Sequence, residues 1–132
     1  MTETELKKAI VDYLVLMGAV VLRINSGGQG EEYTDRRGQT RRRWFDFVHW
    51  FAVGISHEAG RAGVSDLVAF IPAEPVAVTL VIETKVGRNK PTAAQERFLA
   101  ACRVRGVPVV VAYTVEEVRA VVEKISQRRG SG

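Results

Sequence analysis

Two charged residues, Glu83 and Lys85, stand at the end of an otherwise apolar run from Val76 to Lys85. Because side chains alternate along a strand, both project from the same face, about 7 Å apart. An ionised carboxylate in apolar surroundings is costly unless a cation or a hydrogen-bond donor meets it. The pattern therefore predicts a polar site in which something compensates Glu83.

A second carboxylate, Asp66, stands near the start of the preceding apolar run, Val64 to Ile71. Pro72-Ala73-Glu74-Pro75 is a turn signal between the two runs, and it predicts a β-hairpin that brings Asp66 beside Glu83. Two carboxylates and a lysine suit metal-assisted phosphodiester hydrolysis, in which carboxylate oxygens bind Mg²⁺ or Mn²⁺ and the lysine stands near the attacking water. A salt-bridge cluster with no catalytic role is the alternative that these three residues leave open.

The elements around the site alternate between helical and extended patterns. Apolar spacing predicts helices over about 3–17, 92–105 and 114–127, each opened by a capping box, and strands over 19–24, 64–71, 76–85 and 107–113, the last of them buried on both faces. An extra hairpin is expected at about 31–50, with its turn at 36–39, followed by a loop over 54–63 and a disordered tail at 128–132. The order predicts a single α/β domain with a central mixed sheet flanked by helices.

The succession of motifs resembles the VRR-NUC family of PD-(D/E)XK nucleases, in its stand-alone bacterial or phage form. The resemblance covers residues 5–28 and 63–122, and it is carried by an early helical glutamate, a Gly-x-x-Asp-Leu strand start, Glu-x-Lys at a strand end, a glutamine in the first turn of a helix, a Gly-Val strand and a Glu-Glu-Val helix. It implies a restriction-endonuclease-like αβββαβ core. One departure is Ser65, which stands where the family usually has proline and leaves the aspartate in place.

The resemblance also implies roles for individual residues. The expected metal ligands are Glu5, Asp66, Glu83 and the carbonyl of Thr84, and the expected catalytic residues are Asp66, Glu83, Lys85 and Gln95. Lys85 would orient or deprotonate water and offset charge in the transition state. Glu5 and Gln95 also occupy the third position of a capping box, so each has a purely local alternative role in its helix.

Nucleic acid is the partner class that the charge favours. The net charge is +4, and 14 of the 19 basic residues are arginine, whose planar fork suits phosphate. The residues expected to contact DNA are Asn25, Ser26, Arg36, Arg37, Arg41, Arg42, Arg43, Arg88 and Lys90. A merely solvated face is the alternative for the hairpin arginines, whereas Trp44 and Trp50 are expected to pack in the core or in a dimer.

These observations predict a Mg²⁺- or Mn²⁺-dependent, structure-specific endonuclease. The resemblance implies a homodimer that acts on branched DNA such as Holliday junctions. The rival hypotheses are a nicking or restriction-type enzyme acting on linear duplex, and a catalytically silent DNA-binding module. No phosphate-binding Gly-x-x-x-x-Gly-Lys-Ser/Thr loop is present, which argues against a nucleotide cofactor. The absence of an apolar run long enough to cross a membrane and of a secretory pattern leads us to expect a cytoplasmic protein.

Overall fold

A four-stranded mixed sheet forms the body of the protein in the computed structural model, which describes residues 1–24, 28–46, 51–53, 56–58 and 65–130. The strand order is β1 (Val20–Arg23), β6 (Leu67–Ile71), β7 (Val78–Thr84) and β8 (Val109–Ala112). The first two pairings are antiparallel, and β7 pairs with β8 in parallel. The expected αβββαβ core with a mixed sheet is thereby confirmed.

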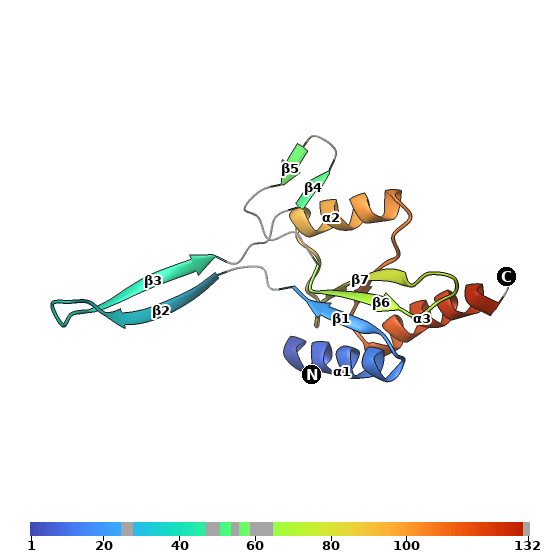
Figure 1. Cartoon of the computed structure of the whole chain (residues 1–132), viewed down its shortest axis with the longest axis horizontal. Coiled ribbons are helices and arrows are strands. Elements are labelled where there is room, and N and C mark those ends of the chain that lie inside the picture. The colour runs from blue at the N-terminus through green and yellow to red at the C-terminus, as the bar shows by residue number, and fades with distance from the viewer. Residues whose placement is uncertain (25–27, 47–50, 54–55, 59–64, 131–132) are drawn as a thin grey trace.

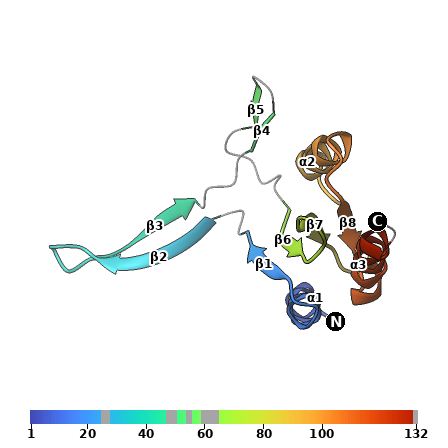
Figure 2. The same cartoon turned by 45° about the vertical axis from the view of Figure 1, so that its right-hand side comes forward.

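Helices cover both faces of this sheet. α1 (Glu3–Leu16) and α3 (Val115–Gly130) lie on one face, and α2 (Ala93–Val104) lies on the other (Figures 1 and 2). The main core fills the space on the α1 and α3 side, and its largest fully buried side chains on those helices and on β6 and β7 are Leu6, Ile10, Leu14, Val118, Val122, Leu67, Ile71, Leu80 and Ile82. The apolar spacing in the sequence predicted these helical faces correctly.

Threonine caps fix the helix starts close to the predicted positions. The side chain of Thr2 accepts a hydrogen bond from the backbone N–H of Glu5, and Thr92 does the same for Gln95 in a complete capping box. Such caps stabilise a helix by about 1 kcal/mol each. The third helix begins as predicted but continues to Gly130, beyond the expected end near Gln127. Within the described part of the chain, no helix is long and apolar enough to span a membrane.

The expected extra hairpin is a two-stranded ribbon made of β2 (Gly28–Thr34) and β3 (Thr40–Asp46). Its turn is closed by Asp35, whose Oδ1 accepts hydrogen bonds from the backbone N–H groups of Arg37 and Gln39, each at 2.9 Å. Figure 1 shows the ribbon extending away from the sheet. It begins earlier than the predicted residue 31, and positions 47–50 of the predicted second arm lie outside the described residues.

Two predictions about the remaining segments were wrong. Part of the loop expected over 54–63 is strand β5 (Ser56–Glu58), which pairs with β4 (Phe51–Val53). The last strand was expected to be buried on both faces, but β8 is an edge strand, and only its final residue, Ala112, is fully buried. A valine-rich sequence is compatible with a strand that has one neighbouring strand or two, so the sequence did not reveal that β8 lies at the edge of the sheet.

Candidate active site

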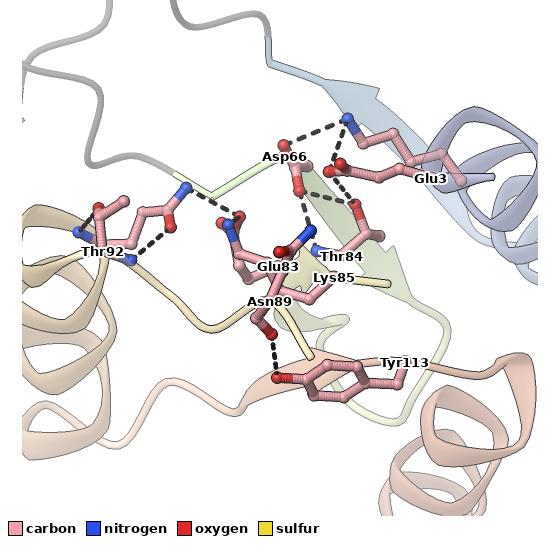
Figure 3. A network of polar contacts seen from close by, with 10 residues as sticks. Glu3, Asp66, Glu83, Thr84, Lys85, Asn89, Thr92 and Tyr113 are labelled. Atoms are coloured by element: carbon pink, nitrogen blue, oxygen red, sulfur yellow. Dashed lines mark hydrogen bonds and ion pairs between the residues drawn. The ribbon is translucent and has the colours of Figure 1, made fainter. Parts of the chain in front are cut away.

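The two predicted carboxylates meet at the rim of the sheet. In the β6–β7 register Leu67 lies opposite Ile82, so Asp66 stands beside Glu83, one step beyond. Asp66 is held there by Thr84, whose backbone N–H and hydroxyl both donate to Asp66 Oδ2, at 2.9 and 2.8 Å (Figure 3). The predicted hairpin therefore brings the two acids together, and Thr84 fixes the position of one of them.

Glu83 is almost completely buried, with 1% of its surface exposed. Its Oε1 accepts a hydrogen bond from Gln95 and lies 3.7 Å from Lys85 Nζ, whereas its Oε2 is buried with no hydrogen-bond partner. Burial raises the pKa of Glu83 from 4.5 to about 8, and the negative charge of Asp66 adds to that rise against the opposing effect of Lys85. The site thus holds one carboxyl that keeps its proton near neutral pH and presents an unsatisfied oxygen.

The side chain of Gln95 completes the predicted capping box and also contacts Glu83, while its catalytic role stays a prediction. Its side-chain oxygen accepts from the backbone N–H of Thr92 at 2.8 Å, which completes the capping box of α2. Its side-chain nitrogen donates to Glu83 Oε1 at 2.9 Å. The cap therefore fixes the amide in the orientation that serves Glu83, so the start of α2 is structurally tied to the end of β7.

The first helix contributes Glu3 and Lys7, two residues that the sequence analysis missed. Lys7 Nζ lies 3.4 Å from Asp66 Oδ1 and 3.5 Å from Glu3 Oε1, and the Thr84 hydroxyl lies 3.4 Å from Glu3. Glu5, which was expected to be a metal ligand, is exposed, and among the described residues its side chain has no contact with the carboxylates.

The helical period explains this difference. Glu3 and Lys7 are four residues apart and extend the buried stripe of Ile10 and Leu14 towards the N-terminus. Glu5 lies off that stripe. Tracing the stripe backwards from the core would have identified Glu3 and Lys7 from the sequence alone.

The loop between β7 and α2 carries Arg88 and Lys90, and both side chains are exposed. The hydroxyl of Tyr113, just after β8, donates a 2.7 Å hydrogen bond to the backbone carbonyl of Asn89, between these two residues (Figure 3). This contact fixes the loop between Lys85 and the start of α2. Arg88 and Lys90 are thus the sequence neighbours of Asn89 in this loop, and their contact with DNA stays a prediction.

The hairpin arginines lie on the ribbon rather than beside the carboxylates. Opposite residues share a face in an antiparallel pair, so Arg41 and Arg43 project from one side, with Tyr33, and Arg42 projects from the other. Arg43 stacks 4.1 Å from the ring centre of Tyr33, and Arg41 forms a 2.7 Å ion pair with Asp35.

Of the four remaining residues predicted to contact DNA, two lie in the turn of the ribbon and two lie outside the described residues. Arg36 and Arg37 occupy the turn at the tip of the ribbon and are exposed. Asn25 and Ser26 lie outside the described residues, as do the side chains of Trp44 and Trp50.

The donor set fits a hard divalent cation. Mg²⁺ binds oxygen ligands and usually retains waters, taking one or two carboxylates plus substrate phosphate rather than a full protein cage. Asp66 and Glu83 supply two carboxylates, and the unpartnered buried Oε2 of Glu83 lacks the donor or cation that such an atom normally has. Among the residues that the structure describes, no three His, Cys, Asp or Glu side chains are grouped to hold a metal by themselves. A cation here therefore depends on further oxygens from backbone, water or substrate.

Comparisons with known proteins agree with this geometry. The VRR-NUC domain family matches residues 54–116, a segment that contains Asp66, Glu83, Thr84, Lys85 and Gln95. A solved structure titled "VRR_NUC domain" has a similar fold, with a TM-score of 0.57 and 20% sequence identity over 92% of this chain and 94% of that one. A search of curated proteins finds no match to the sequence.

Proposed function

We propose that this chain, whose residues 54–116 match the VRR-NUC domain family of PD-(D/E)XK nucleases, is a Mg²⁺- or Mn²⁺-dependent endonuclease that cuts branched DNA. The observation that carries the proposal is the pairing of Asp66 and Glu83 at adjoining strand ends, with Lys85 Nζ 3.7 Å from Glu83. The buried Oε2 of Glu83 has no hydrogen-bond partner, whereas a salt bridge that only stabilised the core would not require an unpartnered oxygen.

In the proposed reaction, Asp66, Glu83 and the Thr84 carbonyl would hold the cation, and a cation bound there would supply a Lewis acid for the phosphate and lower the pKa of water. Lys85 orients the attacking water and offsets the charge that develops on the phosphate. The water oxygen forms a new bond to phosphorus and gives up a proton to the surrounding water, while the bond from phosphorus to the 3′ oxygen breaks; the 3′ oxygen takes up a proton from water to become a hydroxyl, and the new phosphate monoester is the 5′-phosphate. Gln95 keeps Glu83 oriented through its 2.9 Å hydrogen bond, and Glu3 takes the accessory place expected for Glu5.

We further propose that two copies associate, and an exposed apolar area on the sheet supports this. Val20 and Leu22 of β1 are 60% and 48% exposed, and Phe70, directly opposite Val20 in β6, is 38% exposed. Neighbouring apolar side chains on one open sheet face are typical of an interaction surface. Light scattering at micromolar concentration is expected to give the mass of a dimer for the wild type and of a monomer for Val20→Glu. Val104→Glu, at an 83% exposed valine on α2, is the matched control and is expected to remain dimeric.

The test of the nuclease is cleavage of a labelled four-way junction and of its matching linear duplex with Mg²⁺, Mn²⁺ or EDTA. We expect cutting of the junction that requires the metal and that falls by at least 10²-fold in Lys85→Ala, because the removed charge acts on the transition state. Lys124→Ala, at an exposed lysine on α3, is the control and should retain full activity. Equal cutting of both substrates would favour the nicking or restriction-type alternative, and tight binding without cutting in any metal would favour the silent binding module.

A further inference from the structure

A groove between α1 and β1 lies next to the site and has no part in the chemistry above. Its volume is about 390 Å³. Its apolar lining residues, which we call the floor, are Val11, Val21 and Leu67, and its basic lining residues, which we call the rim, are Lys7, Lys8 and Arg23. Pockets for small organic groups usually begin at about 300 Å³ and combine an apolar lining with a few polar groups. The groove thus has the size and lining to take one nucleotide.

The groove lies beside Asp66, because its lining includes Leu67, the next residue along the chain, and Lys7, which pairs with Asp66. Arg23 lies opposite Leu67 in the β1–β6 register, and the next residue, Ile24, donates its backbone N–H to the carbonyl of Asp66 at 2.8 Å. On the other wall, Lys7 reaches Asp66 at 3.4 Å. The groove is therefore adjacent to the proposed catalytic carboxylate, where it could receive a nucleotide next to the one that is cut.

The charge at the rim suits a phosphate. Arg23 is exposed, and within the described residues its side chain forms no hydrogen bond or ion pair, so its guanidinium is available to a ligand. Lys8, also on the rim, pairs with Asp12 at 2.8 Å, but both groups are largely exposed, and such a surface pair contributes little. An apolar floor beneath a free guanidinium matches the two halves of a nucleotide, the flat base and the charged phosphate.

We propose that the groove between α1 and β1 binds one unpaired nucleotide of the DNA next to the scissile phosphate, with its base on the apolar floor and its phosphate at Arg23. The inference rests on the proposed nuclease function. A base inside a duplex is stacked and paired, so it cannot enter the groove without being extruded, which costs its stacking and pairing energy. A branch point or frayed end provides such a base at little cost. The groove is therefore a source of preference for branched over linear DNA.

Two surface variants test the phosphate contact at Arg23 and the base contact on the apolar floor separately. Arg23→Ala removes the phosphate contact, and Thr4→Trp places a large ring in the groove from an exposed position in the first turn of α1. Arg103→Ala, at an exposed arginine on α2, is the control. Binding of a fluorescein-labelled four-way junction and of a 15-nucleotide oligothymidylate is measured by anisotropy in EDTA, which prevents metal-dependent cutting.

We expect Arg23→Ala to weaken binding of both probes by about 5- to 10-fold and to reduce the slope of log Kd against log salt by about one. Thr4→Trp should weaken binding by a similar factor and leave that slope unchanged, because no charge is lost. Arg103→Ala should stay within about 2-fold of the wild type. Wild-type affinity in both groove variants would overturn the proposal.

A scan of the junction with single abasic sites provides a second readout. We expect one position near the branch at which removal of the base weakens binding of the wild type but has no effect on Thr4→Trp. Equal sensitivity of the two proteins at every position would overturn the proposal. Binding in EDTA does not require catalysis, so the two proposals can fail separately. If these binding effects are seen but no DNA is cut, only the proposed nuclease function is refuted. If DNA is cut but both groove variants bind like the wild type, only the proposed groove is refuted.

Discussion

The replacement of Glu83 by glutamine gives a direct test of the electrostatics of the site. Glutamine has the shape of a protonated glutamic acid but cannot ionise. In the folded protein the pKa of Glu83 is raised from 4.5 to about 8, so the folded state favours the protonated form. A group of this kind contributes its full stability below the unfolded-state pKa and loses it as pH rises through the folded-state pKa.

The magnitude follows from the two pKa values. A shift of one pKa unit corresponds to 1.36 kcal/mol, so a rise from 4.5 to about 8 makes the metal-free protein about 5 kcal/mol less stable when Glu83 is fully ionised than when it is protonated. Most of this change falls in an accessible window. Between pH 5 and pH 8 the linkage relation gives a loss of about 3 to 4 kcal/mol.

The assay is urea unfolding in EDTA at several pH values from 5 to 8. Other groups titrate in this range, so the informative quantity is the difference between the wild type and Glu83→Gln at each pH. We expect the variant to gain about 3 to 4 kcal/mol relative to the wild type as pH rises from 5 to 8. Glu123→Gln, at an exposed position on α3, should follow the wild type throughout. A constant difference between the wild type and Glu83→Gln would refute the assignment of a proton-holding carboxyl.

Three further predictions address the cation, the amide and the ribbon. Mg²⁺ at 100 times its dissociation constant is expected to stabilise the wild type by about 2.7 kcal/mol at pH 8, a rise in Tm that calorimetry would detect, and to leave Asp66→Asn unchanged; equal shifts in both proteins would contradict the ligand assignment. Gln95→Ala is expected to lower the free energy of unfolding by about 2 kcal/mol in urea titrations, because it removes both one arm of the capping box and the hydrogen bond to Glu83, and a loss under 0.5 kcal/mol would show that the amide is idle. If DNA lies along the face of the ribbon that carries Arg43, Arg43→Ala should weaken binding to duplex in anisotropy titrations and reduce its salt dependence more than Arg42→Ala on the opposite face, whereas equal effects would show that neither face is preferred.

The chemistry-bearing part of the site was predictable because it depends on short-range pattern. Alternation along a strand placed Glu83 and Lys85 on one face, and a turn signal brought Asp66 alongside. The capping box positioned Gln95 at the helix start, although only the structure showed that the same amide also serves Glu83. In each of these cases the separation of the residues along the sequence determined how their side chains lie relative to one another.

The parts that the sequence did not reveal depend on contacts between distant segments. Glu3 and Lys7 join the site only because α1 packs against β1 and β7 with its N-terminus at the strand ends. The alternative, Glu5, had equal local justification as a capping-box residue. The edge position of β8 likewise depends on strand order, which no local pattern encodes.

The pairing of β1 with β6 has a consequence for how such a protein can change over evolutionary time. Arg23, the last residue of β1, is the register partner of Leu67, the first residue of β6, and the Ile24–Asp66 hydrogen bond closes the ladder just beyond them. The two ends of the intervening segment are therefore held side by side, next to the proposed catalytic pair. Because backbone pairing holds these two ends together, a change in the length of the β2–β3 ribbon need not shift the register of β1 against β6, and the ribbon can diverge while the positions of the sheet residues are kept.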